Sequence, residues 1–193
     1  MAKNWPPFHH ETERLILRDW RDEDWEPFWN GTNTPAVMEY LGGVADAKTK
    51  ADAQARLQKY HHDHGHTFWP IERKKDGAIL GFCGLKICTE EEGPLGMMEA
   101  GWRLREDAWG QGYAKEAAIA SLDLAFGRFG AEETIAMTVE ANTGSWGLMN
   151  RLGMTRRPEL DFDETMWAQD YGMVIVYSIT REAWAEHRES LIG

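Results

Sequence analysis

Apolar and polar residues repeat with two different periods in the middle of the chain. Over 95–104 the two kinds alternate, which predicts a strand on which Glu99 and Arg103 share one face. From Ala114 onward the spacing becomes that of a helix with one buried face. The small or apolar positions of this helix are 114, 117, 118, 121, 122, 125, 126 and 129, and Ser121 is the polar member.

The rest of the pattern predicts shorter elements. Two strands are expected within 66–90, around a polar turn at 74–77 whose Asp-Gly pair is typical of hairpins. Other strands are expected at 14–20, 134–140 and 173–179, and helices at 25–29, 49–64, 142–152 and 181–188. Alternating strands and helices are typical of a mixed α/β sheet. We expect an irregular arm at 1–13, a single domain at 14–188 and a tail at 189–193.

Composition narrows the class of protein. The 193 residues are 42% hydrophobic and 27% charged, enough for one domain with a full core. A formal net charge of −11 argues against a nucleic-acid partner, because phosphate binding needs clustered cations. No apolar run is long enough for a membrane span, and the first residues lack the apolar segment of a signal peptide. We therefore expect neither a nucleic-acid nor a membrane partner.

Cysteine and histidine residues offer little for metal binding. Cys83 and Cys88 are too few for a disulfide framework or a set of four ligands, so we expect no metal and a cytoplasmic location. The tract His61–His66 (HHDHGH) is favoured as an exposed polar turn over a metal site, because it has no distant ligand set. Ten tryptophans leave open whether the chain forms a homodimer.

A glycine-rich loop, Trp109–Lys115 (WGQGYAK), joins the predicted strand to the long helix. Gly110 and Gly112 allow a tight turn with consecutive N–H groups pointing outward, and the helix dipole favours an anion such as a pyrophosphate there. The loop does not match a dinucleotide-binding fingerprint, which would need a third glycine at the position of Lys115. It does not match a P-loop either, because the sequence Gly-Lys-Ser/Thr is absent. The loop alone is equally compatible with a plain turn into a core helix.

Four motifs follow one another along the chain. Glu99–Leu104 (EAGWRL) and, five residues later, Gly110–Ala117 (GQGYAKEA) together resemble the acetyl-CoA-binding motif of the GNAT superfamily of N-acetyltransferases. Glu13–Arg18 (ERLILR) and Asn142–Met154 are similar to the opening strand and the late helix of its RimJ/RimL-type branch, the ribosomal-protein N-acetyltransferase-like enzymes. The resemblance covers about residues 12–185 in the right order.

The resemblance implies a GNAT fold, with a sheet splayed between its fourth and fifth strands and acetyl-CoA as co-substrate. The pantetheine arm would fill the gap and pair with the backbone of Trp102, Arg103 and Leu104, and Asn142 would form a hydrogen bond with it. The pyrophosphate would lie on the N–H groups of Gly110, Gln111, Gly112, Tyr113, Ala114 and Lys115. Arg103, Arg105 and Lys115 are the cations available beside this polyanion.

Acyl transfer from a thioester needs a neutral amine, a stabilised oxyanion and a protonated leaving thiolate. A lysine-like amine, with a pKa of about 10.4, must first lose a proton. We expect Glu99 to be the base, and a solvated carboxylate, a salt bridge to Arg103 or a water chain in its place are the alternatives. The oxyanion would meet a main-chain N–H near Trp102.

The proton donor to the leaving sulfur is less well marked. Many GNAT members use a tyrosine on the late helix, where this sequence has Met149. Ser145, one turn earlier, is the expected donor, as RimL-like enzymes imply, and a helix cap is its alternative role.

The sequence therefore predicts direct transfer of an acetyl group to a primary amine within a ternary complex. The acceptor would be a protein or peptide N-terminal amine or a small amine. One alternative is a non-catalytic acyl-CoA-binding module or sensor, which Met149 favours. Another is a phosphate-binding α/β protein such as a dinucleotide binder.

Overall fold

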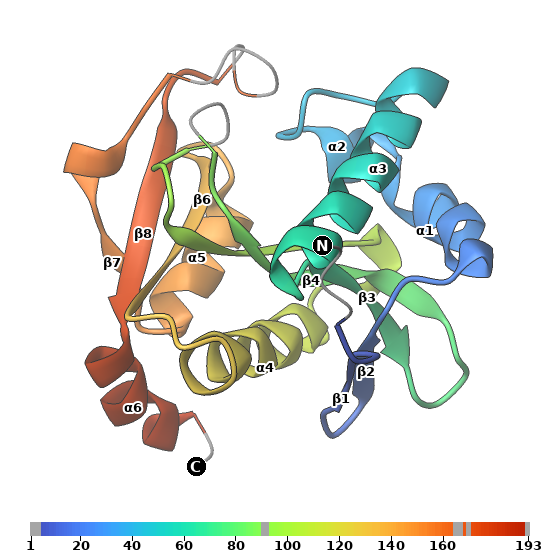
Figure 1. Cartoon of the computed structure of the whole chain (residues 1–193). Helices are drawn as coiled ribbons and strands as arrows, with labels where there is room; N and C mark the ends of the chain where they lie inside the picture. Colours follow the sequence, from blue (N-terminus) through green and yellow to red (C-terminus); the bar gives the residue numbers. More distant parts are fainter. Residues whose placement is uncertain (1–4, 90–92, 164–167, 169–170, 192–193) are drawn as a thin grey trace.

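Eight strands form one sheet in the computed structural model, which describes residues 5–89, 93–163, 168 and 171–191 (Figure 1). Their order across the sheet is β1-β2-β3-β4-β5-β6-β8-β7, and every neighbouring pair is antiparallel except β5 and β6. The strands are β1 (His9–Glu11), β2 (Leu15–Arg18), β3 (Phe68–Arg73), β4 (Ile79–Ile87), β5 (Met98–Leu104), β6 (Glu133–Val139), β7 (Thr155–Arg156) and β8 (Val174–Thr180). The helices are α1 (Trp25–Thr32), α2 (Pro35–Met38), α3 (Ala47–His64), α4 (Tyr113–Gly127), α5 (Thr143–Arg151) and α6 (Arg181–Ser190).

The sheet parts between β5 and β6. These strands pair at two positions within the described residues, Met98 with Thr134 and Glu99 with Ile135. On its other side β5 stays paired with β4 along its whole length. The predicted splay is therefore confirmed. The predicted fourth and fifth strands are β5 and β6 here, because His9–Glu11 adds a strand at the start.

Three short elements were not predicted. β1 lies in the expected irregular arm and forms by pairing with β2, while α2 and β7 are too short to show a period. At the other end, α6 runs on to Ser190 and so includes the first residues of the expected tail.

The two faces of the sheet are covered by different helices (Figure 1). α4 packs on one face through the stripe of small and apolar residues that its sequence predicts. The buried hydroxyl of Ser121 donates a hydrogen bond to the carbonyl of Ala117 at 2.9 Å. On the opposite face α1 packs Phe28 against Phe82 of β4. Cys83 and Cys88 are buried, and neither forms a disulfide within the described residues. Within the described chain, no helix has both the length and the apolar character that a membrane crossing requires.

The histidine tract differs from expectation. α3 continues through His64 and ends at Gly65, which adopts φ of 72° in the left-handed region. His66 is buried rather than in an exposed turn, with Nδ1 3.0 Å from the carbonyl oxygen of Leu85 and its ring against Phe129. Burial lowers the pKa of His66 to about 4. The described residues contain no group of three or more metal-ligating side chains that could hold an ion.

Burial of a neutral His66 predicts acid-sensitive stability. Between pH 6.5 and 4 the unfolded state binds one more proton than the folded state, so the free energy of unfolding falls as the pH falls. From pH 7 to pH 5 the loss assigned to His66 is about 2 kcal/mol. Denaturant titrations at both pH values should show this loss in the wild type and in the exposed-site control His62→Gln, and a smaller loss in His66→Gln. Equal losses in all three proteins would contradict the assignment.

Candidate functional site

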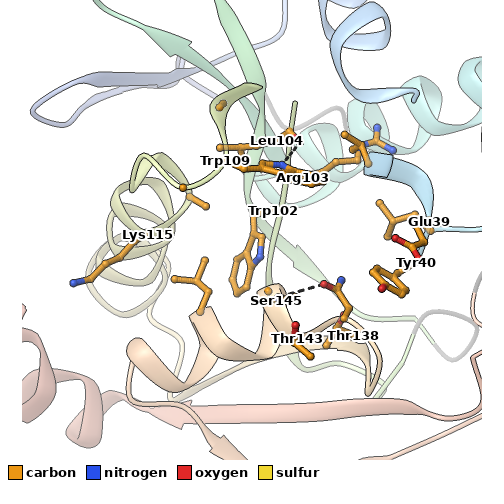
Figure 2. Close-up of a pocket in the computed structure, with 18 of the residues that line it drawn as sticks. Glu39, Tyr40, Trp102, Arg103, Leu104, Trp109, Lys115, Thr138, Thr143 and Ser145 are labelled. Carbon is orange, nitrogen blue, oxygen red and sulfur yellow. Dashed lines mark hydrogen bonds between the residues drawn. The ribbon is translucent and has the colours of Figure 1, made fainter. Parts of the chain in front are cut away.

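A cavity of about 720 Å³ opens where β5 and β6 part (Figure 2). Its wall comes from α2 and the residues after it, the end of β5, the glycine loop, β6 and the start of α5. The predicted site residues that line it are Trp102, Arg103, Leu104, Gly110, Gly112, Tyr113, Ala114, Lys115, Asn142 and Ser145. Gln111 and Glu99 do not line it. The fold thus brings most of the predicted positions, over 40 residues apart in sequence, to one cavity.

The glycine loop presents free main-chain donors. Trp109 donates its backbone N–H to the carbonyl of Glu106, and the first helical bond of α4 runs from Glu116 to Gly112. No described residue accepts a hydrogen bond from the N–H groups of positions 110–115. Gly110 and Gly112 have φ of 70° and 80°, a conformation that glycine adopts without strain. Six free donors at the positive end of a helix favour an anion.

Arg14, which precedes β2, holds this loop in place. Its Nε lies 2.6 Å from Glu116 Oε2, and its Nη1 donates to the carbonyl of Gln111 at 2.9 Å. The guanidinium also lies 4.5 Å from the centre of the Tyr113 ring. Burial raises the pKa of Glu116, but hydrogen bonds from Thr12 and Arg14 outweigh it and lower that pKa below its usual value. The Gln111 carbonyl is thereby held on Arg14.

The three predicted cations have different surroundings. Arg105 forms an ion pair with Asp107. Arg103 extends away from Lys115, toward the side of the cavity where Glu39 and Tyr40 lie (Figure 2). Lys115 is therefore the predicted cation that lies on the loop side of the cavity.

Arg103 sits among aromatic rings. Its guanidinium carbon is 4.8 Å from the ring centre of Phe28, 5.1 Å from Trp29 and 4.9 Å from Phe82. Its Nη1 points to Met38 Sδ at 3.2 Å. Burial, with a smaller effect from the charge of Arg56, lowers the pKa of Arg103 to about 10, so the group is still a cation at neutral pH.

Glu99 shares the face of Arg103, as the alternation predicts, but has other partners. Its Oε2 lies 3.2 Å from Lys86 Nζ and 3.8 Å from Cys88 Sγ. The side chain is 12% exposed and does not line the cavity. Glu99 does not form the salt bridge to Arg103 that was one of the alternatives. Its ion-pair partner is Lys86, which lies opposite Glu99 on the neighbouring strand β4.

The start of α5 is fixed by Asn142. Its Oδ1 accepts the backbone N–H of Ser145 at 3.3 Å, so Asn142 and not Ser145 is the side-chain cap (Figure 2). Met149 is fully buried in the core.

Tyr40 and Glu39, which follow α2, also line the cavity and were not predicted. Partial desolvation of the Tyr40 phenol and the nearby negative charge of Glu39 raise the pKa of that phenol. No period marks so short a helix, so the sequence gives no signal for these two residues.

Comparison with known proteins identifies the family. The acetyltransferase (GNAT) domain matches residues 14–155, so the chain belongs to the GNAT acetyltransferase family. The uncharacterized protein YkkB of Bacillus subtilis is 31% identical over 144 residues, 74% of this chain and 83% of YkkB. An FsC-acetyl coenzyme A-N(2)-transacetylase of Aspergillus fumigatus is 38% identical over 115 residues, 56% of this chain and 48% of that protein.

A solved structure gives the same fold. The ribosomal-protein-S5-alanine acetyltransferase of Vibrio fischeri superposes with a TM-score of 0.72 at 17% identity, covering 92% of this chain and 98% of that one. At this identity the likeness concerns the fold, and the RimJ/RimL-type branch stays a prediction. GNAT acetyltransferases use acetyl-CoA as co-substrate and act on amine acceptors.

The free amides of the loop predict that Gly112→Val abolishes acetyl-CoA binding. A side chain at φ of 80° costs roughly 1–2 kcal/mol and, in addition, its Cβ would lie 3.3 Å from Nη2 of Arg14, the residue that holds the loop in place. Gly130→Val is the matched control, since Gly130 has φ of 69° with open space around it and does not line the cavity. Calorimetric titration should show at least about a hundredfold loss of affinity, about 2.7 kcal/mol, in Gly112→Val alone. Wild-type affinity in Gly112→Val would remove the loop from the site.

Proposed function

We propose that this protein transfers the acetyl group of acetyl-CoA to a primary amine while both substrates are bound. The observation that carries the proposal is the set of free N–H groups at positions 110–115, five of them on residues that line the same cavity as the edge of β5 that β6 leaves unpaired. The N–H groups of the loop can donate hydrogen bonds to a diphosphate. The unpaired edge of β5 can form backbone hydrogen bonds with an extended arm that contains amides.

The cofactor would lie along the cavity from the loop to the parted strands. The amides of 110–115, Gln111 included, would bind the pyrophosphate, and Lys115 would add a positive charge. The backbone of Trp102, Arg103 and Leu104 would pair with the pantetheine arm. The Oδ1 of Asn142 is engaged by Ser145, which leaves the amide nitrogen of Asn142 to donate to a pantetheine carbonyl.

The chemical step requires proton transfers at two points. Glu99 does not line the cavity, so it would take the proton of the amine through an intervening water. A main-chain N–H near Trp102 would stabilise the oxyanion. The hydroxyl of Ser145 would donate to the leaving thiolate, and the phenol of Tyr40 is a second donor on the cavity wall.

A non-catalytic acyl-CoA-binding module is the second candidate. The ion pair of Glu99 with Lys86 and the burial of Met149 favour it, because both remove an expected acid or base from the cavity. Membership of an acetyltransferase family favours the enzyme.

Acceptor class, location and assembly are parts of the same proposal. A protein or peptide N-terminal amine follows from the RimJ/RimL-type motifs, and a small amine is the other acceptor class. The name of the Aspergillus relative supports transfer from acetyl coenzyme A to a nitrogen atom, N(2). A cytoplasmic location and a homodimer stay predictions from the sequence.

The proposal is tested by incubating the protein with acetyl-CoA and a panel of amines while free thiol is followed. The panel includes peptides with free N-termini and small primary amines, and mass spectrometry identifies the acetylated product. Acetyl-CoA binding with no turnover on any amine would support the binding module instead.

A base at position 99 predicts a particular pH profile. Glu99→Gln should lower kcat by about a hundredfold at neutral pH, because general base catalysis typically contributes at least this much. The rate should recover at high pH, where the amine is neutral without help, and acetyl-CoA affinity should be unchanged. Glu26→Gln, which removes an exposed carboxylate of α1 outside the cavity lining, is the control for a general charge effect. Full activity of Glu99→Gln at every pH would show that another group is the base.

A further inference from the structure

Arg103 is a partly buried cation for which the described residues supply no anionic partner. Its Nε is buried and has no hydrogen-bond acceptor, and the sulfur of Met38 is the acceptor found for its Nη1. No carboxylate of the described residues lies within ion-pair distance of it. The one other charge found to act on it is a second cation, Arg56 of α3.

The aromatic rings around Arg103 offset part of this cost but do not supply an acceptor. Phe28, Trp29 and Phe82 attract the cation through their faces and hold the guanidinium in one place. A guanidinium carries five N–H donors in a planar fork that matches a carboxylate. A buried charge ordinarily has a counter-ion and satisfied hydrogen bonds. An anion with two acceptor oxygens would supply both the counter-charge and the hydrogen-bond acceptors.

A ligand would reach Arg103 through the cavity described above. Arg103 is part of the cavity wall, and its side chain extends away from Lys115 and the glycine loop (Figure 2). A phosphate held by the free amides of 110–115 would therefore lie on the loop side of the cavity, away from the direction in which the Arg103 side chain extends. Glu39, which lines the same side as Arg103, supplies a carboxylate for a cationic amine.

We propose that Arg103 binds a carboxylate of the acceptor, so that the acceptor is a small amino acid carrying both an amine and a carboxylate. This inference rests on the proposed acetyl transfer and narrows its acceptor. Glu39 would attract the ammonium group before it loses its proton. The apolar wall of Val37 and Leu41 suits a hydrocarbon side chain.

The test compares amino acids with their own carboxamides. L-leucine and L-phenylalanine are each paired with the α-carboxamide, and kcat/KM is measured for all four with saturating acetyl-CoA. The wild type should prefer each acid over its amide by about thirtyfold or more, since loss of one partner of a buried charge pair costs at least about 2 kcal/mol. Peptides with an acidic second residue form a further arm, and a preference for them over both free acids would overturn the small-acceptor inference.

Two variants assign the preference to Arg103. Arg103→Met removes the charge but leaves an apolar chain for the aromatic rings, and should bring the acid-to-amide ratio to about one. Arg103→Lys keeps the charge without the planar fork and should restore part of the ratio. Lys115→Met is the matched control, which should weaken acetyl-CoA binding and leave the ratio unchanged.

The outcomes separate this inference from the proposed function. Acetylation of the amines with a ratio near one in the wild type would overturn the inference while the proposed function stands. Where no amine is acetylated, calorimetric titration of the CoA-saturated protein decides the inference alone. Binding of L-leucine but not its carboxamide, lost in Arg103→Met, would still support the carboxylate site, and no binding of either would overturn it.

Discussion

The hydrogen-bond ladder between β5 and β6 ends after Glu99, and the rest of the site depends on this gap. A strand inside a sheet normally satisfies its backbone on both sides, and an unpaired buried group costs free energy. Here β5 keeps β4 on one side and faces a cavity on the other. The same divergence separates α4 from α5, so the amino ends of both helices border one space.

The local geometry of this space favours an anion although the net charge of the protein is negative. The donors at positions 110–115 are main-chain groups, which carry no formal charge. Arg14 and Glu116 fix the loop from outside the cavity, through an ion pair and a bond to the Gln111 carbonyl. The net charge of −11 is a sum over the whole chain, and interactions between exposed charges are screened over about 10 Å in salt solution.

The period of two along β5 divides the site into two halves. Trp102 and Leu104 point toward α4 and the core on that face, whereas Glu99 and Arg103 point to the face covered by α1. The unpaired backbone edge of β5 therefore meets the cavity, while its alternate side chains meet the surroundings of each face of the sheet.

The sequence by itself determined the elements with a strong local period. α4, β5 and the glycine loop were predicted because the residues that define them are neighbours in sequence, and the ordered motifs identified the family. Tertiary structure alone decided the partners of the charged residues. Arg14 meets Gln111 across 97 positions, Glu99 pairs with Lys86 of the adjacent strand, and Arg103 inserts among the aromatic rings of α1 and β4. A side chain's period shows which face it occupies, but what lies over that face depends on segments folded there from elsewhere in the chain.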